Sequence, residues 1–175
     1  PTVVSSGAVA LGVERLGLAG KPKEMALKQA AAAVGQSRLM RLWDDQFEAR
    51  GLVCAQVLLT EEDFSDRRRY LNLSQTISTL LELNVIPVIN ENDTVTTAEL
   101  EASDPGSHRR VNFGDNDKLS ALIASKMEAD LLVILTDVDG LYTDDPRDSE
   151  AAELVAEVNE ITPELLAAAG GARVG

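Results

Sequence analysis

The chain has 175 residues, of which 45% are hydrophobic and 26% charged, as in an ordinary globular protein with a buried core. Its net charge of −13 argues against nucleic acid or an anionic membrane surface as a partner, because both require a basic face. A small anionic substrate is still allowed, since it needs only a local positive site.

The single cysteine, Cys54, lies in the apolar run LVCAQVLL and is expected in the core. One cysteine excludes a disulfide framework and fits a reducing, cytoplasmic setting. No apolar run approaches the roughly 18 residues needed to span a bilayer, and no signal-peptide pattern is present. The sequence opens inside an apparent strand and stops in the glycine-rich AAAGGARVG, so we expect residues 1–175 to be a partial domain truncated at both ends.

Continuous apolar runs alternate with segments of helical composition. In chain order the sequence predicts a strand at 2–4, helices at 8–17 and 21–51, a strand at 52–59, a helix within 61–84, a strand at 85–89, a helix at 115–127, strands at 130–136 and 153–158, and a helix at 162–170. This alternation is typical of an α/β fold in which a mainly parallel central sheet is covered by helices on both faces, a three-layer sandwich.

Several of these predictions depend on single residues. Gly35 is expected to break the helix at 21–51, and Pro87 is expected near a sheet edge or a bulge. Thr162 is the predicted N-cap of the last helix. Residues 94–113 have mixed charge and no periodicity, and a connection of that length is typical of a lid.

Polar clusters follow the predicted strands, at the edge of the sheet where α/β proteins bind ligands. They are SSG at 5–7, NEND at 90–93, GDND at 114–117 and TD at 136–137. The first three also have a plain structural interpretation: Ser6 and Gly7 as a helix cap with anion-binding amides, Asp93 as an Asx-turn, and GDND as helix capping. A cap needs only one such residue, however, and GDND supplies three in succession.

The sequence contains no P-loop and no complete dinucleotide fingerprint, and one cysteine with one histidine makes zinc improbable. His108 is expected to be merely exposed, and Asp139 with Gly140 to form a tight turn. Magnesium-assisted phosphoryl transfer remains open, because it needs carboxylates, main-chain amides and cations rather than a nucleophilic triad.

Six motifs, in order along the whole chain, resemble the glutamate 5-kinase branch of the amino acid kinase family. They are VSSGAVALG, KQAAAAVGQSRLM, QVLLT, PVINENDTV, FGDNDKLSALIA and LTDVDGLYTDDPR. The resemblance implies the amino acid kinase fold and transfer of the γ-phosphoryl of ATP, with Mg²⁺, to the side-chain carboxylate of L-glutamate. It also implies glutamyl 5-phosphate as product, a place in proline biosynthesis, proline as feedback inhibitor, and a homo-oligomer.

The resemblance also implies roles for individual residues. Ser6 and Gly7 match substrate-contacting positions, Asp93 matches the acid that holds the substrate's amino group, and Asn116 matches a glutamate-binding asparagine. Asp117 matches the acid that orients catalytic lysines near the metal, and Asp115 supports that cluster. Thr136 and Asp137 match residues beside the nucleotide.

Nothing in the chain matches the family's glycine-rich first strand with its catalytic lysine, nor its later nucleotide segment with a second lysine. The 175 residues alone are therefore expected to be inactive. The alternatives are the kinase half of a bifunctional pyrroline-5-carboxylate synthase, a sibling kinase for N-acetylglutamate, aspartate or a nucleoside monophosphate, and a non-catalytic proline or glutamate sensor. An acid such as Asp93 favours a substrate with a free amino group over an acetylated one.

Overall fold

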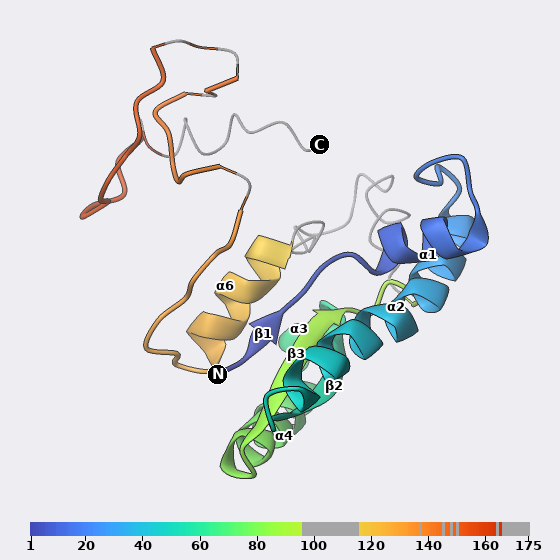
Figure 1. Ribbon diagram of the computed structural model, residues 1–175. Coiled ribbons are helices and arrows are strands. Elements are labelled where there is room, and N and C mark those ends of the chain that lie inside the picture. Colours follow the sequence, from blue (N-terminus) through green and yellow to red (C-terminus); the bar gives the residue numbers. More distant parts are fainter. Residues whose placement is uncertain are drawn as a thin grey trace. The chain divides into compact units, whose positions relative to one another are not determined.

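The computed structural model describes residues 1–95, 116–136, 138–144, 146–147, 149, 151–163 and 165 (Figure 1). The chain divides into two compact units, Pro1–Leu132 and Val133–Gly175, and each is described by itself. Apart from its first two residues, the predicted lid at 94–113 lies outside the described part of the chain.

The first unit contains a parallel sheet of three strands in the order β1-β3-β2. The strands are β1 (Val3–Val4), β2 (Val53–Leu59) and β3 (Val85–Glu91). The helices are α1 (Ala8–Leu16), α2 (Met25–Glu48), α3 (Glu62–Ser65), α4 (Arg67–Glu82) and α6 (Asn116–Lys126). The predicted α/β class with parallel strands is confirmed.

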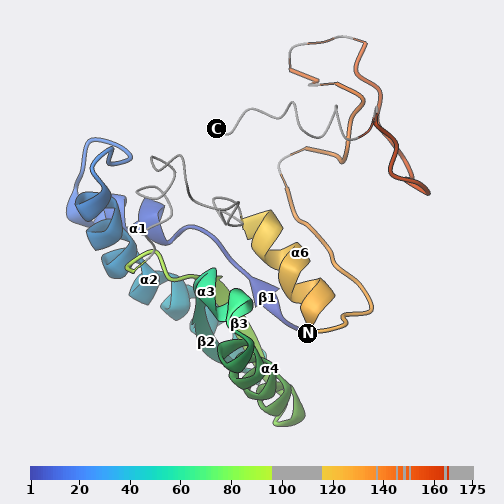
Figure 2. The same cartoon turned by 180° about the vertical axis from the view of Figure 1, so that it is seen from behind.

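Helices cover both faces of this sheet. Figures 1 and 2, which view the unit from opposite sides, show α2 over one face and α4 over the other. Side chains of β3 alternate between the two faces. Asn90 contacts α2 through Gln36, which assigns Ile86 and Val88 to the same face, and Ile89 points to the opposite one. The strand is nearly all buried because it lies between two helical layers.

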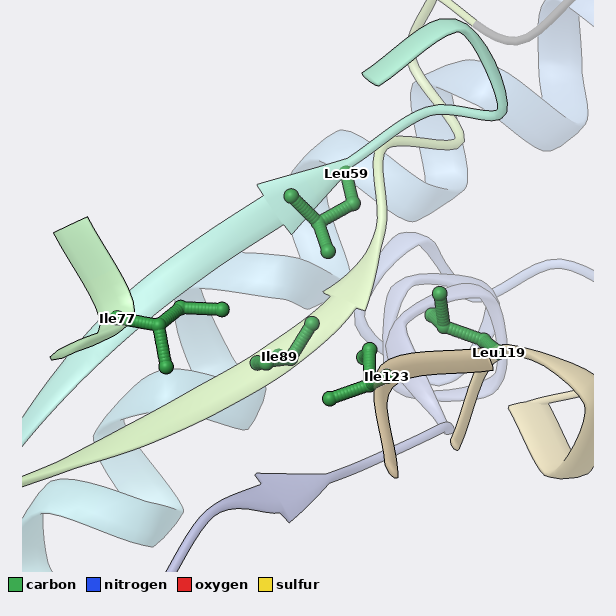
Figure 3. Close-up of a cluster of buried hydrophobic side chains, with 5 residues drawn as sticks. All are labelled: Leu59, Ile77, Ile89, Leu119 and Ile123. Atoms are coloured by element: carbon green, nitrogen blue, oxygen red, sulfur yellow. The ribbon is translucent and has the colours of Figure 1, made fainter. Parts of the chain in front are cut away.

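On the face of the sheet that α4 covers, the core is a cluster of aliphatic side chains from four elements (Figure 3). Its buried members are Leu59, Ile77, Ile89, Leu119 and Ile123. Burying a side chain of this size contributes roughly 1.5–3 kcal/mol relative to exposure. The cluster holds α6 against β1 and β3, so it fixes where the first turn of α6 lies.

Gly35 does not break a helix, contrary to the sequence-based prediction, because α2 runs unbroken from Met25 to Glu48. The reason for a glycine is contact between helices. A Cβ at Gly35 would overlap the Ala8 carbonyl of α1, and a Cβ at Gly12 would overlap the Ala31 carbonyl of α2. The two helix backbones therefore touch, and glycine is required there for space.

The prediction that Pro87 lies near a sheet edge is also wrong. Among the described strands β3 is the central one, and Pro87 is buried within it. Its missing N–H costs no ladder bond. The carbonyl of Ile89 accepts from Ser5 N–H on the β1 side, and residues two apart in a strand present their polar groups to the same neighbour. Pairing with β1 starts only at Val88, so the nitrogen of Pro87 lies ahead of the paired region.

Residues 130–136, the segment with the clearest strand pattern, are not a strand. Leu131 is 78% exposed and Leu135 is 91% exposed. A strand exists only where a neighbour completes its hydrogen bonds, and none is paired with these residues in the described part of the chain.

The second unit has one isolated antiparallel bridge, Tyr142 with Leu154, in place of the strand predicted at 153–158. Leu165 N–H donates to Thr162 Oγ1 at 3.2 Å, which confirms the predicted N-cap.

Cys54 in β2 of the first unit is half-buried. Burial and the Asp44 carboxylate, whose Oδ1 is 3.7 Å from Sγ, together raise the pKa of the Cys54 thiol. No helix within the described ranges has the length and apolar character to cross a membrane.

The contact between the two helix backbones predicts the effect of one methyl group. Gly35→Ala is expected to lower the free energy of unfolding by about 3 kcal/mol or more, at or beyond the upper end for overpacking, because the obstacle is a backbone carbonyl. Denaturant unfolding monitored by circular dichroism measures this change.

Gly20→Ala is the matched control, since a Cβ there would meet no atom within 4 Å. Its effect is expected to lie within about 0.5 kcal/mol of zero. Equal stability of the two variants would contradict a tight backbone contact at Gly35.

Candidate functional site

The first wall of the site is the loop between β1 and α1. Ser5 N–H donates to the Ile89 carbonyl at 2.9 Å, and Trp43 Nε1 of α2 donates to Ser5 Oγ at 2.9 Å. Gly7 follows as the N-cap of α1 with φ of 110°, a left-handed conformation that disfavours any side chain. The chain thus turns sharply into α1, and Ser6 and Gly7 lie at the positive end of that helix.

The second wall is the carboxyl end of β3. Asn90 is only 4% exposed, and both ends of its side-chain amide are hydrogen bonded. Its Nδ2 donates to Gln36 Oε1 at 3.0 Å, and its Oδ1 accepts from Asn116 Nδ2 at 3.3 Å. Asn92 N–H then donates to the Leu59 carbonyl at 2.7 Å, which carries the chain past the end of β2.

The third wall is the first turn of α6. The helix begins at Asn116, with Asp117 as the acid in its first turn, where the helix dipole favours a negative charge. Leu119 and Ile123, on the buried face of the same helix, anchor it in the core described above. The hydrogen bond from Asn116 to Asn90 joins this turn to the end of β3.

These walls line a cavity that is open to solvent and has a volume of about 600 Å³, within the range of small-molecule sites. The lining residues in the described part of the chain all belong to the first unit. They are Ser6, Gly7, Ala8, Val9, Ala10, Val13, Lys21, Lys28, Asn90, Glu91, Asp93, Asn116 and Asp117.

Five of the site residues expected from sequence therefore line one cavity: Ser6, Gly7, Asp93, Asn116 and Asp117. The outermost two, Ser6 and Asp117, are 111 positions apart in the sequence (117 − 6), so the fold, not the sequence, brings them together. The expectation that polar clusters converge at the carboxyl edge of the sheet is met by these three clusters.

Three further site residues were predicted from sequence. Asp115 and Asp137 lie outside the described residues. Thr136 belongs to the second unit, where it is exposed.

Four polar residues that line the cavity in the described part of the chain were not singled out by sequence reasoning: Lys21, Lys28, Asn90 and Glu91. Asn90 opens the NEND cluster, so its position at the end of a strand was a usable signal. Lys28 starts the KQAAAAVGQSRLM motif, but nothing in that motif distinguishes a cavity lysine from a solvated one. Lys21 lies in the connection between α1 and α2, and only the helix packing brings it to the cavity.

The cavity carries both signs of charge, in a protein whose overall charge is strongly negative. Lys21 and Lys28 contribute cations, and Glu91, Asp93 and Asp117 contribute carboxylates. A zwitterion with additional negative charge can find complementary groups in such a site. Among the described residues no group of three or more His, Cys, Asp or Glu is arranged as a metal cage. That is compatible with Mg²⁺, which in phosphoryl-transfer sites binds one or two carboxylates together with substrate phosphates.

Comparison with known proteins gives one family and a consistent set of relatives. The chain is 54% identical over 173 residues to a glutamate 5-kinase of Myxococcus xanthus, covering 99% of this chain and 43% of that protein. It is 54% identical over 163 residues to a glutamate 5-kinase of Methanosarcina barkeri, covering 93% and 40%. A glutamate 5-kinase of Caulobacter vibrioides is 52% identical over 170 residues, covering 97% and 42%.

The chain therefore spans less than half the length of these curated relatives. The model of the amino acid kinase family matches residues 1–174. With its parallel sheet, its two helical layers and a cavity at the carboxyl edge, this chain belongs to the amino acid kinase family.

Proposed function

We propose that the cavity binds L-glutamate and that the protein phosphorylates its γ-carboxylate with ATP, forming glutamyl 5-phosphate for proline biosynthesis. A γ-carboxylate oxygen attacks the terminal phosphorus of ATP, the bond to the bridging oxygen breaks, and ADP leaves with that oxygen. The convergence of five motif residues on one cavity carries the proposal. The 52–54% identity to glutamate 5-kinases supports it.

The charges of the cavity suit each end of this substrate. Asp93 is proposed to bind the α-ammonium, and Lys21 and Lys28 provide positive charge for the two carboxylates. Asn116 is proposed to hold glutamate through its amide. Together these groups distinguish a free amino acid from an acetylated one, because acetylation removes the ammonium that Asp93 would pair with.

The phosphoryl end of the reaction is assigned to α6 and its neighbours. Asp117, in the first turn of α6, is proposed to organise charge around the transferring group, supported by Asp115. Mg²⁺ bound to the ATP phosphates, with Asp117 as a carboxylate ligand, would neutralise the developing negative charge. Thr136 and Asp137 are proposed to bind the nucleotide. The proposal includes cytoplasmic location, a homo-oligomer and feedback inhibition by proline, all of which rest on the family resemblance.

The first test concerns substrate class. Protein expressed from the complete reading frame is expected to form hydroxamate from ATP, glutamate and hydroxylamine, the product that traps an acyl phosphate. N-Acetylglutamate, without the ammonium, is expected to give at least tenfold less at the same concentration. Equal or faster reaction with N-acetylglutamate or aspartate would assign the site to a sibling kinase instead.

The second test separates two neighbours in GDND. Asn116→Ala is expected to raise KM for glutamate more than it lowers kcat, because it removes binding shared by ground and transition states. Asp117→Asn is expected to lower kcat by about a hundred- to a thousandfold, the usual loss of a preorganised electrostatic contact.

Helix capping predicts a different result for the same variant. Asn suits the start of a helix about as well as Asp, so a residue that only caps α6 would leave kcat nearly unchanged. Thermal unfolding of both variants verifies that the protein remains folded. Wild-type kcat in folded Asp117→Asn would reject the assigned role.

A further inference from the structure

Three side-chain amides on three different elements form one chain of hydrogen bonds beside the cavity. Asn116 of α6 donates from Nδ2 to Asn90 Oδ1 at 3.3 Å, and Asn90 of β3 donates from Nδ2 to Gln36 Oε1 at 3.0 Å. Asn116 and Asn90 line the cavity, whereas Gln36 of α2 does not. Among the described residues, Asn90 is the cavity residue through which Gln36 can affect a bound ligand.

The chain of hydrogen bonds has a direction. A neutral amide has one donor end and one acceptor end, and Asn90 uses both. Because Gln36 accepts from Asn90, Asn90 must offer its oxygen to Asn116, and Asn116 must turn its nitrogen toward Asn90. The carbonyl oxygen of Asn116 is then the end of that amide that a ligand meets, and a carbonyl oxygen accepts from an ammonium group.

The direction matters because Asn90 is almost fully buried. At 4% exposure, an amide nitrogen that lost Gln36 would have little access to water, and an unsatisfied buried donor is costly. The Asn90 nitrogen would regain a protein partner if Asn90 and Asn116 both rotated their amides, and Asn116 would then turn its nitrogen, not its oxygen, toward a ligand. Rotation of Asn90 alone would instead present its nitrogen to the nitrogen of Asn116 and break the second hydrogen bond as well.

We propose that Gln36 is a positioning residue, which orients the Asn116 amide through Asn90 so that its carbonyl oxygen receives the ammonium of an α-amino acid. The inference rests on the proposed function, since it concerns the same ligand. It adds a specificity determinant on α2, a helix that otherwise contributes only Lys28 to the cavity lining.

Two substitutions at Gln36 separate hydrogen bonding from packing. Gln36→Met keeps the length of an unbranched side chain and removes the acceptor. Gln36→Glu keeps an acceptor for Asn90 Nδ2 and therefore the direction of the chain of hydrogen bonds. Gln46→Met is the matched control, because Gln46 lies on the same helix but is exposed and accepts only from Arg50, at 3.3 Å, among the contacts described.

Affinity for glutamate is measured by calorimetry on the complete protein, with thermal unfolding to verify folding. Gln36→Met is expected to weaken binding about tenfold, the loss typical of a hydrogen bond whose buried partner is left unsatisfied. Gln36→Glu is expected to stay within about threefold of wild type, and Gln46→Met to be unchanged. Wild-type affinity in Gln36→Met, or equal losses in Gln36→Met and Gln36→Glu, would overturn the inference.

A second measurement needs no ligand and keeps the inference testable if glutamate does not bind. In protein labelled with ¹⁵N-asparagine, the side-chain NH₂ resonance of Asn116 is identified by its loss in Asn116→Ala. Gln36→Met is expected to shift this resonance although Gln36 hydrogen bonds to Asn90 and not to Asn116, whereas Gln46→Met leaves it in place. An unmoved resonance in Gln36→Met refutes the inference, whereas a wild-type protein that fails to bind glutamate refutes the proposed function.

Discussion

Two helix backbones touch where α1 meets α2, because Gly12 and Gly35 leave no side chain between them. The cavity depends on this contact. Gly35 contacts α1 at Ala8, the residue that follows the Gly7 turn. The contact therefore fixes the position of the loop between β1 and α1 relative to α2. The next residue along α2, Gln36, reaches the end of β3. One turn of α2 therefore sets the spacing between the two walls that a ligand would bridge.

The same helix supports the site at a second level. Trp43, two turns beyond Gln36, donates to Ser5 and holds the loop from which Ser6 and Gly7 project. Meanwhile α6 is held from the opposite face of the sheet by the aliphatic cluster. Side chains that could bind substrate thus project from elements that are held on both faces of the sheet. Such support reduces the reorganisation required on binding, and preorganisation is the main source of electrostatic stabilisation in enzymes.

The errors of sequence reasoning share one cause. Gly35, Pro87 and the run 130–136 were interpreted from local tendencies: a glycine breaks helices, a proline avoids central strands, and an apolar β-branched run forms a strand. Each tendency was outweighed by the presence or the absence of a neighbour that the local sequence does not reveal. A neighbouring helix explains Gly35, the late start of β1 pairing explains Pro87, and the lack of a paired neighbour in the described residues explains 130–136.

The sequence by itself determined the α/β class, most helix and strand positions in the first unit, and the polar clusters at strand ends. These follow from periodicity and from residue chemistry, which are local properties. Only the tertiary structure decided that Ser6, Asp93 and Asn116 line one cavity, that Lys28 joins them, and that Gln36 connects to Asn116 through Asn90. The physical reason is that such contacts depend on the crossing of helices and on strand order. Burial of apolar side chains across the whole unit selects those arrangements, and no short stretch of sequence encodes them.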